Sequence, residues 1–379
     1  MAHPTSASYV FADSPRNVYW EMTGACSLAC KHCRAHAVPN RAPEELTTEE
    51  GYRLIDSVKA LGSLLVLTGG DPLERPDLVE LVAYARSLHV PVAITPSTTP
   101  TLTLAVVEQM KELGVAALGV SIDGPTPEVH DHFRGVPGTF GHSMNALAWA
   151  REASLPVQVN TTVTKVTRPH LEALFELLCE NSPPVRRWSL FVLVPTGRGT
   201  SLTALRPAEL EHLFGWVYEV SRTSRFHLSL VEAPHYRRYW LEREQANGVP
   251  TAALAARAAR MGFGVRDGNG VVFVARNGDV FPAGFLPNPC LGNVRTTPLE
   301  TLYRDAPALQ ALRDMDQLRG RCGRCRYRWL CGGSRARAWA ASADLLGEDP
   351  ACVYAPPAIR DEPWPAPAGA PRRSEAVGA

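Results

Sequence analysis

The sequence predicts an α/β protein: an open, partial (β/α)6 TIM-like barrel followed by a small C-terminal domain. Three observations lead to this prediction. Between residues 16 and 230, six short apolar runs alternate with longer helical patterns, as in a parallel sheet whose strands are joined by helices. Six such units are fewer than the eight of a closed barrel. Later, two β-rich runs at 271–282 flank Asn277-Gly278, a strong hairpin signal, and the cysteines gather near both ends of the chain.

The predicted elements follow one another in a regular order. A helix is expected at 47–61, opened by a Thr–Glu capping pair, and another at 75–88 with a proline near its start. The expected strands are the apolar runs at 17–23, 64–70, 90–95, 116–123, 156–164 and 187–195. The predicted units are a barrel at 16–230, a connector at 231–270, a C-terminal domain at 271–355 and a disordered Pro/Ala-rich tail at 356–379.

Composition limits the classes of partner. The chain has 379 residues, of which 45% are hydrophobic and 20% charged, and its formal net charge is +1. This near-neutral charge argues against nucleic acid or an anionic membrane surface as a partner. The N-terminus has no basic start followed by an apolar run, and no apolar stretch approaches the ~20 residues that cross a bilayer. We therefore expect a cytoplasmic protein, in which clustered cysteines bind metal rather than pair.

The first cysteine group directly follows the first expected strand. Cys26, Cys30 and Cys33 are spaced C-x3-C-x2-C. Three thiolates can ligate three irons of a [4Fe–4S] cluster and leave the fourth iron open for a reactant. The alternative is zinc, which needs a fourth ligand that His32 or His36 would have to supply.

This motif resembles that of the radical S-adenosylmethionine (SAM) superfamily, whose signature is C-x3-C-x-aromatic-C on the loop after the first barrel strand. His32 takes the position that is usually Tyr or Phe. The resemblance implies that SAM chelates the open iron and that an electron from the cluster cleaves its sulfonium. The resulting 5′-deoxyadenosyl radical then abstracts hydrogen from a substrate.

Two further motifs extend the resemblance. In "TGGDP", Gly69 and Gly70 fall where the family lets the backbone approach the SAM amino group, and Asp71 replaces a more usual Glu. In "SIDG", the resemblance implies that Ser121 contacts SAM and that Asp123 contacts it or braces the turn. Each motif alone is an ordinary turn or capping pattern; the resemblance depends on their order and spacing.

The remaining SAM contacts are implied for later strands. Arg134 in "HDHFRG" falls where relatives pair an arginine with the SAM carboxylate, which suits a planar guanidinium. Asn160 and the Val194 backbone are expected at the ribose and adenine. All of these positions follow parallel strands, whose carboxyl ends form barrel active sites.

The second cysteine group has four members, spaced C-x2-C-x5-C-x20-C. Taken alone, it suits either a zinc ribbon or a closed iron–sulfur cluster. It resembles the SPASM/twitch domains of radical SAM enzymes, and so implies a small C-terminal iron–sulfur domain with an auxiliary [4Fe–4S] cluster. The predicted ligands are Cys322, Cys325, Cys331 and Cys352. Two roles are open for this cluster: it transfers electrons, or it only stabilises the fold of the domain.

A full SPASM domain holds two clusters, but the cysteines of the inner one are missing. Ala283 and Arg335 take their places, so we expect one auxiliary cluster and a spare Cys290. The vacated space is expected to be filled by protein or to widen the substrate cavity, with Arg335 as a positive charge on its wall.

Substrate residues are expected near the barrel mouth, where arginines suit a carboxylate-bearing substrate. The alternative for this group is a solvated helix start. The group comprises Arg198, Glu232, His235, Tyr236, Arg237 and Arg238, and the catalytic candidates are His235, Tyr236 and Cys290. Cys179 is expected to be an ordinary buried helix residue.

The stretches "FRGVPGTF" and "CGGSRARAWA" place the resemblance nearest to radical SAM/SPASM proteins that modify heme precursors. The expected substrate is a carboxylate-bearing tetrapyrrole or another small metabolite, and the electron donor a flavodoxin or ferredoxin. One alternative is a peptide (RiPP) maturase, although many of these carry an N-terminal recognition domain, and only residues 1–16 precede the first expected strand. Another is a non-catalytic iron–sulfur or zinc-binding electron-transfer protein.

Overall fold

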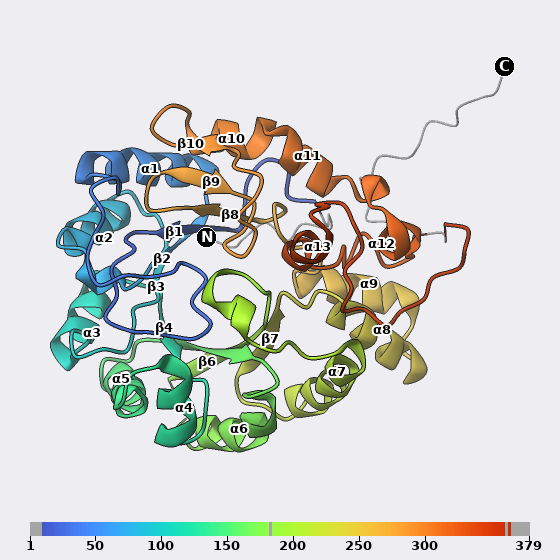
Figure 1. Cartoon of the computed structure of the whole chain (residues 1–379), viewed down its shortest axis with the longest axis horizontal. Helices are drawn as coiled ribbons and strands as arrows, with labels where there is room; N and C mark the ends of the chain where they lie inside the picture. The colour runs from blue at the N-terminus through green and yellow to red at the C-terminus, as the bar shows by residue number, and fades with distance from the viewer. Residues whose placement is uncertain (1–9, 182–183, 361–362, 365–379) are drawn as a thin grey trace.

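The computed structural model describes residues 10–181, 184–360 and 363–364 (Figure 1). Its strands form one ten-stranded sheet in the order β10-β9-β8-β1-β2-β3-β4-β5-β6-β7. In Figure 1 the helices α1, α2, α3, α5, α6 and α7 lie around the outside of the strands. The strands are β1 (Asn17–Glu21), β2 (Leu64–Thr68), β3 (Val92–Ile94), β4 (Ala117–Ser121), β5 (Val157–Val163), β6 (Val185–Val192), β7 (His227–Val231), β8 (Val271–Val274), β9 (Asp279–Phe281) and β10 (Gly292–Asn293).

The six predicted barrel strands are confirmed as β1 to β6. They pair in parallel and in sequence order, so their carboxyl ends lie at one edge of the sheet. At that edge Ser121 of β4 is in register with Asn160 of β5. The parallel strand β7 was not predicted; it extends the sheet beyond β6.

The predicted hairpin is confirmed, but it is also part of the barrel sheet. β8 and β9 are antiparallel around a turn in which Gly278 has φ +87°. On its other side β8 pairs in parallel with β1, with Val272 opposite Val18. This position between two strands buries three of the four residues of β8, which suits its apolar sequence.

The helices largely match the predicted periodicity. At α1 the predicted capping pair is confirmed: the Glu50 N–H donates to Thr47 Oγ1 at 3.2 Å, and the Thr47 N–H donates to Glu50 Oε2 at 2.9 Å. The α-helices are α1 (Thr48–Leu61), α2 (Leu78–Ser87), α3 (Leu104–Glu112), α4 (Pro127–Arg134), α5 (Thr139–Glu152), α6 (Leu171–Glu180), α7 (Pro207–Ser221), α8 (Tyr236–Ala246), α9 (Thr251–Arg260), α10 (Leu299–Asp305), α11 (Pro307–Arg313), α12 (Gly320–Arg324) and α13 (Arg335–Ser342). Helix α2 begins at Leu78, three residues later than predicted, and the short 3-10 helix Pro72–Glu74 precedes it.

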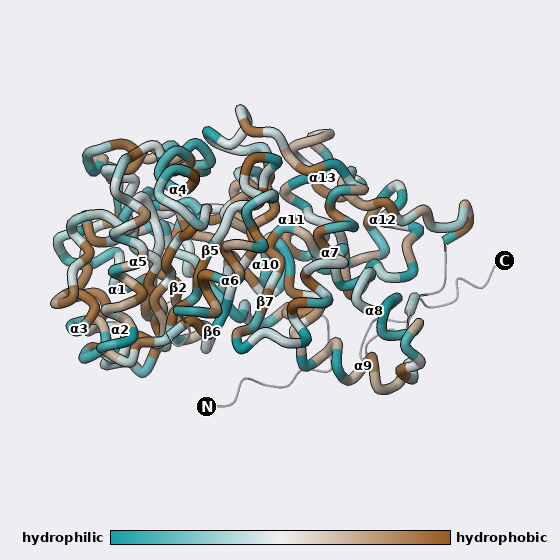
Figure 2. Tube along the Cα trace, turned by 90° about the horizontal axis from the view of Figure 1, so that it is seen from below, coloured by the Kyte–Doolittle hydropathy of each residue, from teal (hydrophilic) through white to brown (hydrophobic). Residues whose placement is uncertain are grey.

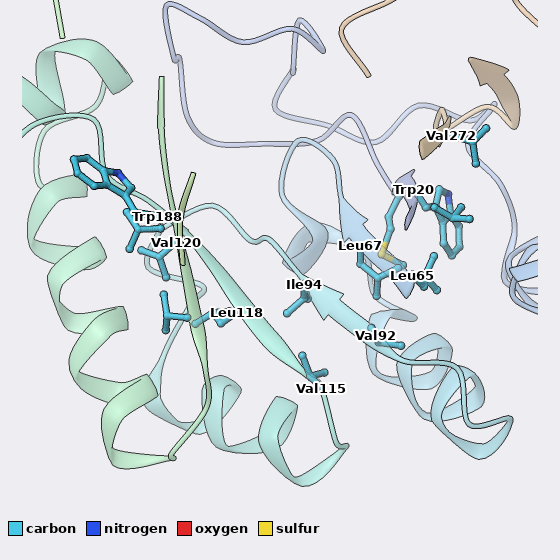
Figure 3. Close-up of a cluster of buried hydrophobic side chains, with 14 of the residues drawn as sticks. Trp20, Leu65, Leu67, Val92, Ile94, Val115, Leu118, Val120, Trp188 and Val272 are labelled. Carbon is cyan, nitrogen blue, oxygen red and sulfur yellow. The ribbon is translucent and has the colours of Figure 1, made fainter. Parts of the chain in front are cut away.

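The main core lies along the barrel strands. Figure 3 shows strand side chains such as Trp20, Leu67, Ile94 and Val120 within it, and each of these is at most 1% exposed. In Figure 2 the hydrophobic colour is concentrated where β2, β5 and β6 are labelled. Because the core holds the strand ends in place, it also positions the loops that carry the site.

A second core joins the connector to the C-terminal segment. Trp240 of α8, Leu254 of α9 and Leu330 near the cysteines pack in one cluster.

Trp364 is also buried in this cluster, and Arg360 pairs with Asp316 at 3.0 Å. The predicted disorder is therefore wrong at these two positions, while residues 365–379 lie outside the described residues. The proposed domain boundaries stay a prediction.

Among the described residues, none of the helices combines the length and the apolar character needed to span a bilayer.

Candidate functional site

The first three cysteines lie together on the loop after β1. Cys26 and Cys30 are buried and Cys33 is half-buried, and all three pack in one small cluster. Backbone N–H groups point at two of the sulfurs: Leu28 donates to Cys26 Sγ at 3.4 Å and Ala37 to Cys33 Sγ at 3.5 Å. Such donors stabilise thiolates that bind iron, so the loop fits a cluster ligand set.

Arg198 holds this loop through three hydrogen bonds. Its Nε donates to the Cys30 carbonyl at 2.9 Å, and its Nη1 donates to the Ala37 carbonyl at 3.2 Å. Its own backbone N–H donates to the Cys33 carbonyl at 2.9 Å. The guanidinium of Arg198 is thus bound to the cysteine loop, and its contact with a substrate stays a prediction.

Gly70 lies against the same loop for a reason that the sequence did not reveal. A Cβ on Gly70 would lie 2.2 Å from the Ala25 carbonyl oxygen, so no side chain fits there. The Gly70 N–H donates to the Thr23 carbonyl at 2.7 Å. At Gly69 a Cβ would lie 2.7 Å from that same carbonyl oxygen. The two glycines let the loop after β2 pack on the cysteine loop; their approach to SAM stays a prediction.

Asp71 links the loops after β2 and β3. Its carboxylate is buried and accepts hydrogen bonds from the N–H groups of Leu73 and Ser97 and from the Thr99 hydroxyl. Burial raises its pKa to about 6. Ser97, which the sequence analysis missed, lies 3.3 Å from Cys26 Sγ through its Oγ. The only sequence signal for it was the polar run "TPSTTP" after the third strand.

Arg134 and Asp123 form a buried ion pair beside the cysteines. Arg134 Nη2 lies 2.6 Å from Asp123 Oδ2, and Nη1 donates to Cys30 Sγ at 3.7 Å. Burial alone would raise the pKa of Asp123, but the Arg134 charge, with smaller contributions from His32, His130 and the Thr162 N–H, holds that pKa below its usual value. Arg134 is thus at the predicted site, with Asp123 as one partner. Its pairing with a SAM carboxylate stays a prediction.

The other predicted SAM residues lie on neighbouring loops and strand ends. The His32 ring stacks on the Phe133 ring, with the two centroids 4.6 Å apart. Burial lowers the pKa of His32 to about 4, so this ring is neutral at neutral pH. Ser121 and Asn160 are adjacent in the sheet. Val194 is buried in a separate small cluster with Ala283. Contacts of these residues with SAM stay predictions.

The second cysteine group lies between α12 and the segment after α13. Backbone N–H groups donate to the sulfurs of all four: Asp349 to Cys322 at 3.4 Å, Tyr327 to Cys325 at 3.3 Å, Gly333 to Cys331 at 3.4 Å, and Tyr354 to Cys352. Burial, and then the charges of the other cysteines, raise the pKa of Cys325 to about 12 and that of Cys331 well above its usual value. Bound iron cations would relieve this repulsion, so the residues fit a cluster. Within the described part of the chain, no three His, Cys, Asp or Glu side chains are gathered so as to hold a single ion.

The place of the missing inner cluster is filled by protein. Ala283 is 8% exposed and packs with Val194, Leu286 and Ala336. Arg335 is fully buried and donates to the carbonyl of Gly347 at 2.6 Å. Of the two expected outcomes, the packing of Ala283 and Arg335 fits filling by protein, and the guanidinium of Arg335 points into the C-terminal core rather than onto a cavity wall.

The remaining substrate candidates also lie in packed surroundings. His235 is fully buried, with its ring 4.8 Å from that of Phe214, and the Tyr236 ring is 5.5 Å from the same ring. Arg238 is buried and pairs with two glutamates, so the solvated-face alternative is also wrong there. The Glu232 carboxylate accepts a hydrogen bond from the Ser334 hydroxyl at 2.5 Å, and Arg237 bonds to the Leu330 carbonyl at 2.7 Å.

Two cysteines and a cavity remain. Cys290 is exposed, with its sulfur 3.5 Å from the Gly292 carbonyl oxygen, and Cys179 is half-buried on α6. The roles proposed for Cys290, His235 and Tyr236 in catalysis stay predictions. A cavity of about 410 Å³ beside α8 is lined by Trp240 and Glu244 among others and contains none of the predicted site residues.

Comparisons with known proteins show which family and which fold this chain shares. The Radical SAM superfamily matches residues 20–178. An AdoMet-dependent heme synthase from Methanosarcina barkeri is 38% identical over 345 residues, covering 91% of this chain and 98% of that protein. Another, from Oleidesulfovibrio alaskensis, is 39% identical and covers 90% and 88%. The PqqA peptide cyclase of Rhizobium meliloti is 26% identical, covering 92% and 88%. The crystal structure of Streptococcus suis SuiB bound to S-adenosylmethionine has a TM-score of 0.70 at 16% identity, covering 90% of this chain and 78% of that one, which shows a shared fold.

Proposed function

The chain belongs to the radical SAM superfamily, and from that membership we propose that it acts on a carboxylate-bearing tetrapyrrole, as a heme synthase that uses SAM. The observation that carries this proposal is identity of 38% and 39% to AdoMet-dependent heme synthases over nine-tenths of the chain. The peptide-modifying relatives, PqqA peptide cyclase and mycofactocin maturase, are 26% and 28% identical over similar lengths.

The protein is an enzyme whose cofactors are a [4Fe–4S] cluster and SAM. Together these supply a 5′-deoxyadenosyl radical that takes a hydrogen atom from the substrate. We assign the cluster to Cys26, Cys30 and Cys33, because they share one loop and two of their sulfurs accept backbone N–H groups. Arg134 beside Cys30 would orient the SAM carboxylate, while Asp123 holds the guanidinium in place.

The C-terminal cysteines complete the proposal. Cys322, Cys325, Cys331 and Cys352 would hold one auxiliary [4Fe–4S] cluster, as supported by the N–H donors to their sulfurs. A flavodoxin or ferredoxin would supply the electron, and the cytoplasm would keep the thiols reduced.

The test is anaerobic incubation of the reconstituted enzyme with SAM, a strong reductant and either tetrapyrroles that carry carboxylate side chains or candidate peptides. Products are scored by mass. We expect a mass change in a tetrapyrrole, accompanied by 5′-deoxyadenosine, and neither with a Cys30→Ala variant. A mass change in a peptide alone would instead make the chain a peptide maturase.

A further inference from the structure

Three arginines next to the C-terminal cysteines, two of them buried and Arg237 half-buried, have no part in the function proposed above. Arg335 is fully buried, and its Nη2 donates to Cys322 Sγ at 3.8 Å. It is the residue that replaces an inner-cluster cysteine. Its contact with Cys322 places a positive charge directly against one of the four sulfurs.

Arg237 and Arg266 approach the same group from the segment around Cys331. Arg237 Nη1 donates to the carbonyl of Leu330, the residue before Cys331, at 2.7 Å. Arg266 packs on Gly332, the residue after it: a Cβ on Gly332 would lie 2.7 Å from Arg266 Cδ. Both guanidinium groups are near enough for their charges to act on the Cys331 sulfur.

These arginines lack carboxylate partners of their own. Apart from the Cys322 contact, their hydrogen bonds go to backbone carbonyls, such as that of Gly264 at 2.7 Å from Arg266 Nη1 and that of Gly347 at 2.6 Å from Arg335 Nη1. In the ranges that the structure describes, no carboxylate lies within ion-pair distance of any of the three. Burial lowers the pKa of Arg266 to about 9, as expected for a cation with too little counter-charge.

The nearby acids are engaged elsewhere. Asp349 pairs with Arg337 at 3.0 Å. The Asp267 charge acts on all three arginines, but Asp267 forms an ion pair with none of them and accepts a hydrogen bond from the Ala336 N–H. Burial, together with the Asp267 charge, raises the pKa of Glu232 well above its usual value. Burial raises the pKa of both Asp267 and Glu232, which weakens their negative charge, so positive charge remains in excess around the cysteines.

A [4Fe–4S] cluster with four thiolates supplies the missing negative charge. It formally carries two negative charges when oxidised and three after one-electron reduction, so nearby cations favour the reduced state. We propose that Arg237, Arg266 and Arg335 raise the reduction potential of the auxiliary cluster above that of the first cluster. This inference rests on the proposed cluster at the four C-terminal cysteines.

The surroundings of the first cluster differ in charge. One neighbouring arginine, Arg134, is balanced by Asp123 at 2.6 Å, and the Asp71 carboxyl acts on Cys26. A second, Arg198, bonds to carbonyls of the cysteine loop. Among the described residues, the structure therefore places one arginine without a carboxylate partner, Arg198, beside the first cysteine group and three beside the second. Since cluster potentials follow local charge and hydrogen bonds to sulfur, the second should be easier to reduce.

The test is an anaerobic redox titration of the full-length holoenzyme followed by EPR. A variant with Cys26, Cys30 and Cys33 all changed to Ala assigns the auxiliary signal. Arg335→Gln should make reduction of the auxiliary cluster at least about tenfold less favourable, which is about 59 mV for one electron. Arg335→Lys, which keeps the charge, should retain most of the potential.

The matched control is Arg313→Gln. Arg313 is also buried and also bonds to backbone carbonyls, those of Tyr303 and Gly268, but it contacts none of the cysteines. Its variant should leave the auxiliary potential unchanged. If Arg335→Gln does not retain its cluster, Arg266→Gln and Arg237→Gln replace it in the test. Each should then lower the reduction potential of the auxiliary cluster in the same direction.

Two outcomes separate this inference from the proposed function. An auxiliary cluster that is present in the Gln variants with unaltered potential would overturn the role of the arginines alone. An absence of iron from the triple Cys→Ala protein would instead overturn the assignment of a cluster to the C-terminal cysteines.

Discussion

At the scale of single residues, the site depends on side chains that hold the cysteine loop rather than on the cysteines alone. Arg134 contacts both Asp123 and Cys30, and Arg198 binds two carbonyls of the loop. Gly70 allows the neighbouring loop to pack against Ala25. Each of these residues preorganises the site, so its loss should change cluster binding as well as stability.

The ion pair between Arg134 and Asp123 gives the first prediction. Arg134→Ala should lower the free energy of unfolding by roughly 3–5 kcal/mol, because it leaves Asp123 charged, buried and unpaired. Anaerobic urea unfolding measures this. Removing both charges in Arg134→Ala/Asp123→Asn should recover part of the loss, and a double variant as unstable as the single one would contradict this explanation.

Gly70→Ala gives the second prediction. Its new Cβ would lie 2.2 Å from the Ala25 carbonyl oxygen, so the cysteine loop must shift. We expect less iron per chain after anaerobic reconstitution, measured by a colorimetric assay. Gly141→Ala in α5 is the control, since a Cβ there meets nothing within 4 Å and alanine favours a helix. Equal iron content in the two variants would show that the contact at Gly70 is unimportant.

At the scale of elements, helix α8 begins beside a buried histidine that ties it to the C-terminal segment. The His235 ring lies edge-on to Phe214 of α7, and its Nδ1 is 3.8 Å from Asp349 Oδ2. Neither ring nitrogen has a hydrogen-bond partner. Burial lowers the pKa of His235 to about 4, so the folded protein keeps this ring neutral.

The third prediction concerns stability at acid pH. Between pH 6.5 and 4 the unfolded chain protonates His235 and the folded chain does not, so stability falls as pH falls through this window, by at most about 1.4 kcal/mol per unit. His235→Leu should remove this part of the pH dependence, as followed by the anaerobic unfolding midpoint. His212→Gln, at an exposed position on α7, should keep it. An identical pH profile for the wild type and His235→Leu would refute the assignment.

At the scale of the whole molecule, the barrel and the C-terminal segment share one sheet. Strand β1 lies between β2 and β8, so the hairpin continues the barrel. Glu21 at the end of β1 pairs with Arg34 of the cysteine loop at 3.0 Å and with Arg276 of the hairpin turn at 2.8 Å. Arg337 of α13 donates to the Glu232 carbonyl beyond β7. The two cysteine groups are therefore held by one connected framework.

The fourth prediction is the iron content of the whole protein. Anaerobically reconstituted protein should contain about eight irons per chain, as two four-iron clusters. Changing Cys26, Cys30 and Cys33 to Ala should leave about four, and changing Cys322, Cys325, Cys331 and Cys352 should also leave about four. Iron near eight after either change would contradict the assignment of the ligands.

Local patterns in the sequence were sufficient for the parts of this protein that depend on neighbours along the chain. Apolar runs and turn residues identified β1 to β6, the α1 cap and the turn at Gly278, because strand burial, capping and tight turns are settled within a few residues. The spacing of the cysteines pointed to the family for the same reason.

Only the tertiary structure decided what depends on residues far apart in the sequence. It placed β8 beside β1, Arg198 on the cysteine loop and Trp364 in the core. It also decided between the two outcomes expected around Arg335, which is buried with its guanidinium at Cys322. From sequence alone, an arginine is expected to be a surface charge or a substrate ligand. Only the tertiary packing shows that backbone carbonyls and a sulfur, rather than water, accept the hydrogen bonds of a buried arginine such as Arg335.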